Sequence, residues 1–242
     1  MKGLGTILNV TAVILGSMLG ILIKGGIKEK MQNVLIQACG LATLFIGISG
    51  ALENMIVVSD GAVSIQGTLL LICSLVIGSL IGEWIDIEAR LESAGEKLKV
   101  IVKSKNDSRF VDGFVTASLV ICIGAMAVVG SLEDGLTGDY SMLLSKSILD
   151  FIIILVFAST MGIGVLFSAL PLGIYQGGIT LLAVFIAPYM TASMISSLSL
   201  VGSVLIFGVG VNLIWENKLR VGNMLPSLFV PIIYELIMQF FA

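Results

Sequence analysis

Residues 5–20 read GTILNVTAVILGSMLG, and the same frame returns 62 positions later as GTLLLICSLVIGSLIG, residues 67–82. Both segments are apolar over almost their whole length, and each carries two glycines four residues apart. Glycines at this spacing let two helix backbones approach closely, and in a bilayer such packing drives helix association. The sequence therefore predicts a repeated membrane-spanning helix with a glycine packing face. The glycines of this face are Gly16, Gly20, Gly78 and Gly82.

The composition agrees with a protein that lies mostly in a membrane. Of the 242 residues, 57% are hydrophobic and 12% are charged, and the mean hydropathy is +1.10. A soluble domain has roughly 25% charged residues. A bilayer core needs about 20 apolar residues per helix, and eight runs come near that length. These runs are 4–23, 33–57, 65–83, 111–132, 147–168, 173–189, 194–214 and 224–241.

We therefore predict an all-α integral membrane protein, a bundle of about eight transmembrane helices. The runs do not alternate polar and apolar residues as membrane strands do. The sixth run, 173–189, is short and ends at Pro188, so the count falls to seven if this segment is re-entrant. The whole chain, 1–242, is expected to form a single membrane domain.

The basic residues predict the orientation. Eleven of the thirteen lysines and arginines lie in three loops, within 24–32, 84–110 and 216–222. Loops rich in lysine and arginine stay in the cytoplasm, and eight spans place all three on that side with both termini outside. Within 84–110, apolar residues recur every three or four positions among charged ones. That spacing predicts an amphipathic connector, which either extends the third span as a helix or lies on the inner membrane surface.

Further repeats extend the pattern. GALEN at 50–54 corresponds to GSLED at 130–134. The economical interpretation is a helix hairpin copied several times in parallel, with units at roughly 4–58, 65–135 and 146–242. Internal repeats are common in transporters, where sites form at repeat interfaces. They also occur in membrane proteins that transport nothing, so the repeat alone does not decide the function.

Polar residues inside the spans are costly and are candidates for function. Asn9 falls on the glycine face of its helix, although the second copy has Leu71 at that place. Both an interhelical hydrogen bond and a contact with solute are open for this amide. Lys146 and Asp150 are one helical turn apart, so an ion pair is available, either as structural glue or as part of a gate. Gln176 lies in YQGGIT, a glycine-interrupted segment of the kind that forms transporter sites.

Two helix ends carry acids at a similar depth. Glu53 with Asn54, and Glu133 with Asp134, lie at the outer ends of the second and fourth spans. The helix dipole disfavours an acid at a C-terminus, and a bound cation, Lys146, exposure to water or protonation would offset that cost. Acids that cap the spans at the interface are the ordinary alternative. The candidate solute- or ion-contacting residues are Asn9, Glu53, Asn54, Glu133, Asp134, Lys146, Asp150 and Gln176.

Several function classes lack support in the sequence. The chain has no histidine and no GxSxG, Walker, HExxH or Cys–His motif. Cys39, Cys73 and Cys122 lie singly in apolar runs, which is typical of packing residues rather than of a disulfide framework. The net charge of −3 favours no polyanionic partner, and no nucleic-acid module is recognisable. We expect no catalytic residues, no cofactor and no nucleic-acid partner, and the sequence leaves a metal site open.

Six segments, in order along nearly the whole chain, carry a resemblance: GTILNVTAVILGSMLG, GLATLFIGISGALEN, FVTASLVICIGAMAVVGSLEDGL, KSILDFIIILVFASTMGIGVLFS, YQGGITLLA and VGNMLPSLFVP. Together they resemble a bacterial family of multi-pass inner-membrane proteins that is known only as a domain of unknown function. The resemblance implies a location in the bacterial inner membrane. Members of the family are loosely called possible transport proteins. The resemblance implies no particular site residues in this sequence.

The sequence leads us to expect a transporter or channel for a small solute or ion, with a cation or a proton as the coupled species. The chain has no ATP-binding motif, so such transport is passive, gradient-driven or coupled through a partner. The alternatives are a non-transporting membrane scaffold or accessory subunit and, third, a carboxylate-based intramembrane enzyme. The expected partners are the lipid bilayer and the solute or ion. The glycine faces could build either the core of the protomer or the interface of a homo-oligomer.

Overall fold

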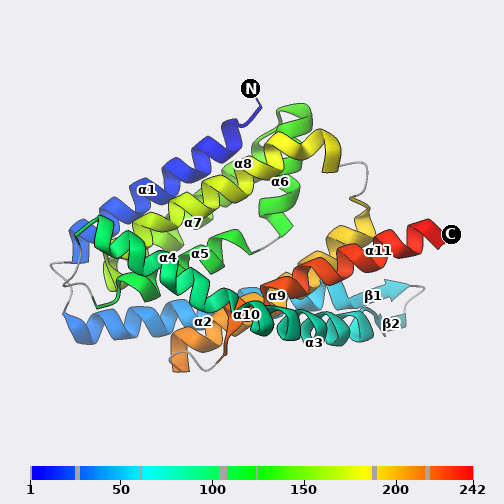
Figure 1. Ribbon diagram of the computed structural model, residues 1–242, viewed down its shortest axis with the longest axis horizontal. Coiled ribbons are helices and arrows are strands. Elements are labelled where there is room, and N and C mark those ends of the chain that lie inside the picture. The colour runs from blue at the N-terminus through cyan, green and yellow to red at the C-terminus, as the bar shows by residue number, and fades with distance from the viewer. Residues whose placement is uncertain are drawn as a thin grey trace. The chain divides into compact units, whose positions relative to one another are not determined.

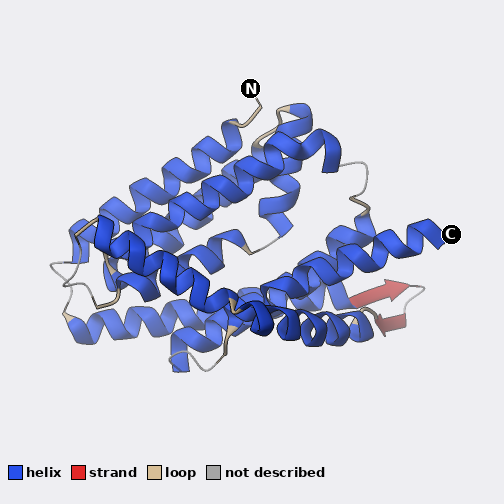
Figure 2. Cartoon of the chain, viewed as in Figure 1, coloured by secondary structure: helices blue, strands red, loops and turns tan. Residues whose placement is uncertain are grey.

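The computed structural model is built almost wholly of helices, with one two-stranded hairpin (Figure 1, Figure 2). The predicted all-α membrane class is thereby confirmed. The residues that the structure describes are 2–24, 28–59, 62–103, 108–123, 125–186, 190–215 and 219–241.

The elements follow one another in the order labelled in Figure 1. The first half contains α1 (Leu4–Lys24), α2 (Glu29–Met55), β1 (Ile56–Ser59), β2 (Ala62–Ile65), α3 (Thr68–Ile85), α4 (Ile87–Ile101) and α5 (Phe110–Cys122). The second half contains α6 (Ala125–Thr137), α7 (Ser141–Met161), the 3-10 segment η1 (Ile163–Ser168), α8 (Ala169–Ile186), α9 (Ala192–Trp215), α10 (Val221–Met224), the 3-10 segment η3 (Leu225–Leu228) and α11 (Phe229–Phe241).

Six helical segments among the described residues are long and apolar enough to cross a bilayer. A seventh is added if α5 and α6 form one span, although the two helices are bent by 61° at their junction. The prediction treated 111–132 as one continuous run, so this bend is new. The predicted eighth run, 224–241, contains η3 and α11, and α11 has only 13 residues. The count of eight therefore stays a prediction.

The boundary between the fifth and sixth predicted runs lies earlier than expected. Helix α7 ends at Met161 because Gly162 takes a φ of +88°, a conformation that side chains disfavour. Segment η1 then leads into α8, and residues 163–185 together qualify as one candidate span. The expected re-entrant segment 173–189 is thus mostly part of a longer helical stretch, and residues 187–189 lie outside the described residues.

The described chain divides into two compact units. Unit 1 contains α1, α7, η1, α8, α5 and nearly all of α6 and α4. In it α1 runs parallel to α7, since Gly5 faces Leu143 and Gly20 faces the Leu155 carbonyl. Helix α1 is antiparallel to α8, and the hydroxyls of Thr6 and Thr180 lie 3.3 Å apart across that contact. Unit 1 therefore buries one face of α1 between two neighbours.

Unit 2 contains the second half of α2, the β-hairpin, α3, α9, α10, η3 and α11. Helix α2 is antiparallel to α9, since Gly40 faces Ile214 and Gly50 faces Ser203. The glycine face of α3 packs on the segment that leads into α11 rather than on a parallel helix. The two copies of the glycine frame thus meet different partners in the two units.

The β-hairpin is an element that the sequence prediction missed. Strands β1 and β2 pair antiparallel with Ile56 opposite Ile65 and Ser59 opposite Ala62. The segment is rich in β-branched residues, and Asp60–Gly61 is a dipeptide favoured in hairpin turns, although these two lie outside the described residues. The hairpin spans residues 56–65, and this short segment between two long helices gives a weak signal beside the strong helical pattern.

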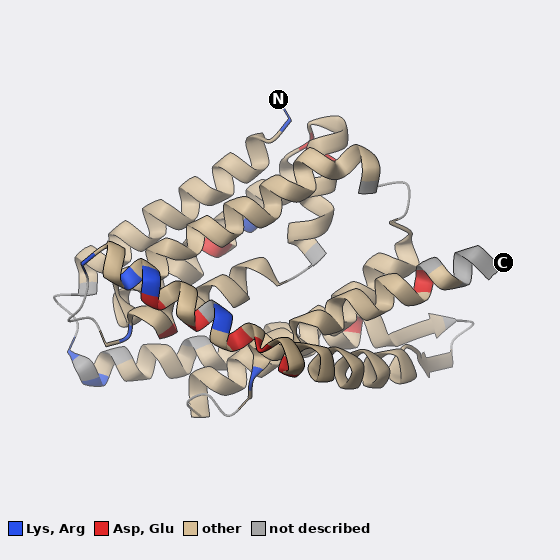
Figure 3. Cartoon of the chain, in the orientation of Figure 1, with Lys and Arg blue, Asp and Glu red and all other residues tan. Residues whose placement is uncertain are grey.

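The predicted connector 84–110 contains a separate helix. Asp86 adopts a left-handed conformation with φ of 54°, which ends α3 and allows α4 to begin at Ile87. Figure 3 shows that charged residues gather on α4 and on this corner, while the long helices are mostly free of charge. The connector is therefore not a simple continuation of α3.

Candidate functional site

A buried ion pair of unit 1 lies on α7. Lys146 Nζ and Asp150 Oδ2 are 2.5 Å apart, and both residues are less than 8% exposed. Asn9 of α1 donates from Nδ2 to Asp150 Oδ2 at 3.0 Å and to Gln176 Oε1 of α8 at 3.3 Å. Asn9 and Gln176 have no exposed surface. We call these four residues the α1–α7–α8 cluster.

The local sequence explains why these side chains meet. Lys146 and Asp150 are spaced by four residues, which stacks them on one face of α7. Asn9 shares the glycine face of α1, and a Cβ at Gly16 would come within 2.7 Å of the Phe151 carbonyl. Close backbone approach along this face brings the short Asn9 side chain within reach of α7. Four of the eight predicted site residues are thus neighbours in space.

Two atoms of the cluster lack a hydrogen-bond partner within the described part of the chain. They are Asn9 Oδ1, an acceptor, and Gln176 Nε2, a donor. Buried polar groups in proteins are almost always paired, because an unpaired one costs about 1–3 kcal/mol. An acceptor and a donor left open beside a buried ion pair can receive a small polar molecule or ion.

Asp134 has a different setting from the one its sequence position suggested. Its carboxylate accepts hydrogen bonds from the backbone N–H groups of Gly3 at 3.0 Å and Gly5 at 2.9 Å. These donors belong to the start of α1, where the helix dipole is positive and N–H groups have no partner inside the helix. Asp134 therefore anchors the N-terminus of α1 to α6.

Replacing Asp134 with alanine is expected to destabilise the protein by about 1–2 kcal/mol, because α1 loses a charged acceptor at its N-terminus. The measurement is thermal unfolding of the purified protein in detergent. Glu133→Gln is the matched control, since the neighbouring acid makes none of these contacts with α1. Equal losses in both variants would contradict the anchoring role.

The remaining predicted candidates do not join the α1–α7–α8 cluster. Glu133 is half-buried on α6, and Glu53 is exposed on α2. Asn54 lies in unit 2, where its amide donates to the Gly50 carbonyl at 2.7 Å and to the Ser199 hydroxyl at 3.1 Å. Glu53 and Asn54 thus belong to unit 2, whereas Glu133 belongs to unit 1.

Unit 2 holds a pocket of about 710 Å³ that the sequence prediction missed. It lies among α2, α3, α9 and α11, close to the helix ends that flank the β-hairpin. Its polar lining includes the amide of Asn54, three serines of α9 and Glu235 of α11. The signal for it was the serine-rich start of α9, SMISSLSL, which is unusual in an otherwise apolar span.

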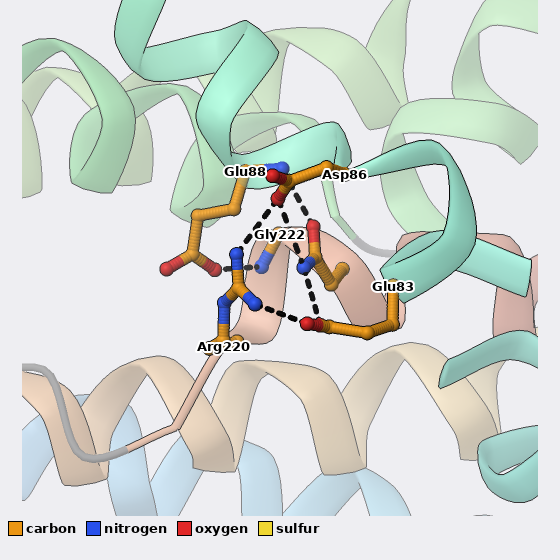
Figure 4. A network of polar contacts seen from close by, with 6 residues as sticks. Glu83, Asp86, Glu88, Arg220 and Gly222 are labelled. Atoms are coloured by element: carbon orange, nitrogen blue, oxygen red, sulfur yellow. Dashed lines mark hydrogen bonds and ion pairs between the residues drawn. The ribbon is translucent and has the colours of Figure 1, made fainter. Parts of the chain in front are cut away.

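A third polar group joins α3 and α4 to α10 (Figure 4). The Arg220 guanidinium contacts the carboxylates of Glu83 and Asp86, the latter at 2.7 Å. Asn223 donates to Glu83 at 2.7 Å and accepts from the Glu88 backbone N–H at 2.7 Å. Glu88 in turn accepts from the Gly222 N–H at 3.0 Å. These contacts clamp the α3–α4 corner against the loop before α10.

The predicted packing glycines lie against backbone atoms of neighbouring segments. A Cβ at Gly78 would overlap Ser227, and one at Gly82 would overlap the Asn223 carbonyl oxygen. A Cβ at Gly16 or Gly20 would meet α7 in the same way. No Cβ could be added at these positions without a shift of the neighbouring backbone.

The described residues contain no group of three or more acids or cysteines placed to hold a metal ion. Cys73 is exposed and Cys122 is half-buried, and both are free thiols. The side chain of Cys39 lies outside the described residues. The polar groups of these sites are carboxylates, amides and hydroxyls, together with the Lys146 ammonium and the Arg220 guanidinium.

Comparisons with known proteins place these features in a family. The family model described as "Protein of unknown function (DUF554)" matches residues 4–236. The uncharacterized membrane protein YdfK of Bacillus subtilis (strain 168) is 35% identical over 227 residues, covering 94% of this chain and 93% of the relative. The uncharacterized protein YqgA of Escherichia coli (strain K12) is 30% identical over 231 residues, covering 94% of each. No solved structure matches the chain.

Proposed function

The chain belongs to the family described as protein of unknown function DUF554, and we propose that it transports or conducts a small solute or ion through the α1–α7–α8 cluster. It is a multi-pass membrane protein, so the cluster's helices lie in or near the bilayer. The observation that carries the proposal is the buried Lys146–Asp150 pair beside two unpaired amide atoms. Ionisable groups inside membrane helices are expensive and mark ion or proton paths.

A proton or a cation is the species that fits the cluster best. Asp150 Oδ2 already accepts from both Lys146 and Asn9, so the carboxylate is held by two donors. A proton or cation that reaches Asp150 would compete with the Lys146 ammonium and release it from the pair. Such an exchange gives the cluster two states, which gradient-driven transport requires. No ATP-binding motif enters the proposal, and the chain itself is proposed to catalyse no chemical reaction.

The proposed setting is the bacterial inner membrane, with both termini outside and the basic loops 24–32, 84–110 and 216–222 in the cytoplasm. The helix directions support this topology. Helix α1 is parallel to α7 and antiparallel to α8, as alternating spans require. Helix α2 is likewise antiparallel to α9.

The test is proton flux in proteoliposomes that contain a trapped pH-sensitive dye, with the membrane potential clamped by potassium and valinomycin. After an imposed pH step, with and without sodium, the wild-type protein should move protons faster than protein-free vesicles. Asp150→Asn should lower that flux at least about tenfold, because the buried group that binds the proton is removed.

Asp139→Asn is the matched control for this experiment. Asp139 is an exposed acid in the loop before α7, and hydrogen bonds from Ser141 lower its pKa. Its neutralisation should leave the flux unchanged. Wild-type flux equal to that of empty vesicles, or equal flux in wild type and Asp150→Asn, would refute the proposed role of the cluster.

A non-transporting scaffold or accessory subunit is the second candidate function. It is favoured by one observation, namely that Asn9 of α1 and Lys146 of α7 both donate hydrogen bonds to Asp150. In that case the cluster acts only as structural glue. A scaffold predicts no proton flux in any variant, together with a loss of stability when the pair is broken.

A further inference from the structure

The pocket of unit 2 combines a polar wall and an apolar wall. Its apolar side is formed by Leu69 and Leu70 of α3 and Leu200 of α9. Its polar side carries Ser193, Ser196 and Ser197 of α9, Asn54 and Gln66, and the Tyr234 and Glu235 pair of α11. A volume of about 710 Å³ lies within the range of sites for small organic molecules.

The charge that lines the pocket is negative. Among the described residues that line it, Glu235 is the one charged side chain. The Ser193 hydroxyl donates to Glu235 Oε1 at 2.5 Å, which fixes the carboxylate toward α9. Asn54 is likewise held, because its Oδ1 accepts from the Ser196 hydroxyl at 2.9 Å. Hydrogen bonds between helices therefore join side chains of the polar wall.

Two segments of unit 1 match segments that line the pocket in sequence. SMLLSKS at residues 141–147 matches SMISSLS at 193–199, 52 positions later, and this places Leu198 where α7 has Lys146. Likewise Tyr175–Gln176 of α8 matches Tyr234–Glu235 of α11, 59 positions later. Unit 1 thus carries its own ammonium beside a neutral amide, whereas unit 2 carries an acid and no internal ammonium at the matching place.

We propose that the pocket of unit 2 binds an organic ammonium ion that carries an apolar group. The Glu235 carboxylate and the neighbouring serine hydroxyls receive the ammonium, since charge-assisted hydrogen bonds are stronger than neutral ones. Tyr234 lines the same pocket and supplies an aromatic ring with which a cation can interact. Leu69, Leu70 and Leu200 contact the apolar part. This binding site is separate from the cluster of the proposed function and does not depend on it.

An ammonium group has two sources near a membrane, a soluble amine and the headgroup of phosphatidylethanolamine. The test uses benzylamine as the probe and benzyl alcohol as its neutral match, with the full-length protein in phosphatidylglycerol nanodiscs. Binding is measured by calorimetry and by protection of Cys73 against N-ethylmaleimide, read by mass spectrometry, because Cys73 lines the pocket.

We expect benzylamine to bind at least about tenfold more tightly than benzyl alcohol and to slow the labelling of Cys73. Glu235→Gln should weaken benzylamine binding by about tenfold or more. Glu53→Gln is the matched control, because Glu53 lies next to Asn54 but does not line the pocket, and it should bind as wild type. The double variant Lys146→Met/Asp150→Asn, which removes both charges of the α1–α7–α8 cluster, should bind benzylamine as wild type, and this separates the pocket from the proposed transport function.

Each outcome decides the proposal. Weaker benzylamine binding in phosphatidylethanolamine nanodiscs would support the ammonium site and assign the lipid headgroup as its occupant. Unchanged binding there would support the site and assign a soluble amine. Equal affinity for benzylamine and benzyl alcohol, or absence of both binding and Cys73 protection in wild type, would overturn it. If Glu235→Gln fails to fold, the comparison of the two probes on the wild-type protein still decides.

Discussion

Removing either partner of the Lys146–Asp150 pair is expected to destabilise the protein by about 3 kcal/mol, whereas removing both charges together should restore most of that loss. Either Lys146→Met or Asp150→Asn leaves one charge without its partner in a setting that is almost completely buried. A lone buried charge costs several kcal/mol, while a pair of neutral groups of similar size costs little. The double variant Lys146→Met/Asp150→Asn should therefore lie within about 1 kcal/mol of wild type.

The measurement is thermal unfolding of the four proteins in one detergent, arranged as a double-mutant cycle. A coupling free energy close to zero would contradict the burial and pairing of the two charges. Asp139→Asn again serves as the control, since an exposed acid should shift stability by less than about 0.5 kcal/mol.

The same four proteins separate stability from transport. If the cluster only holds the helices together, the double variant regains stability and its proton flux equals that of the wild type. If the cluster binds a proton or cation, the double variant is stable but its proton flux stays low. This combination, a well-folded protein without flux, is the expected result, because Asp150 supplies the group that binds the ion.

Only part of the contacts in the α1–α7–α8 cluster could be predicted from the sequence. The pairing of Lys146 with Asp150 follows from a four-residue spacing, which local helix geometry determines. The face of α1 that carries Asn9 follows from the glycine pattern. The identity of its partners does not, because Asp150 and Gln176 are 141 and 167 residues away and only the tertiary packing brings them together.

The other sites show the same limit. Asp134 looked like a charge at a helix end, and its role depends on two N–H groups at the far end of the chain. The pocket of unit 2 draws its lining from four separate elements, so no single motif marks it. The hairpin and the bend between α5 and α6 are short interruptions, and hydropathy averaged over a span does not detect them.

The second large effect concerns the glycine face of α3. Gly82→Ala is expected to destabilise the protein by about 3 kcal/mol, because the added methyl group would overlap the Asn223 carbonyl oxygen. The carbonyl belongs to the backbone and cannot turn aside as a flexible side chain does. Relief requires a shift of α10, and that shift strains the hydrogen bonds of Asn223 to Glu83 and to the Glu88 N–H.

Gly178→Ala in α8 is the matched control. This glycine is also inside an apolar helix, but a Cβ there would meet no atom within 4 Å. Alanine is a better helix former than glycine by roughly 1 kcal/mol, so Gly178→Ala should leave stability unchanged or raise it. Both variants add one methyl group to the chain, and thermal unfolding in detergent measures both. A loss at Gly82 with none at Gly178 would show that backbone approach at the α3–α10 contact, and not the loss of glycine itself, sets the effect, while similar values would refute it.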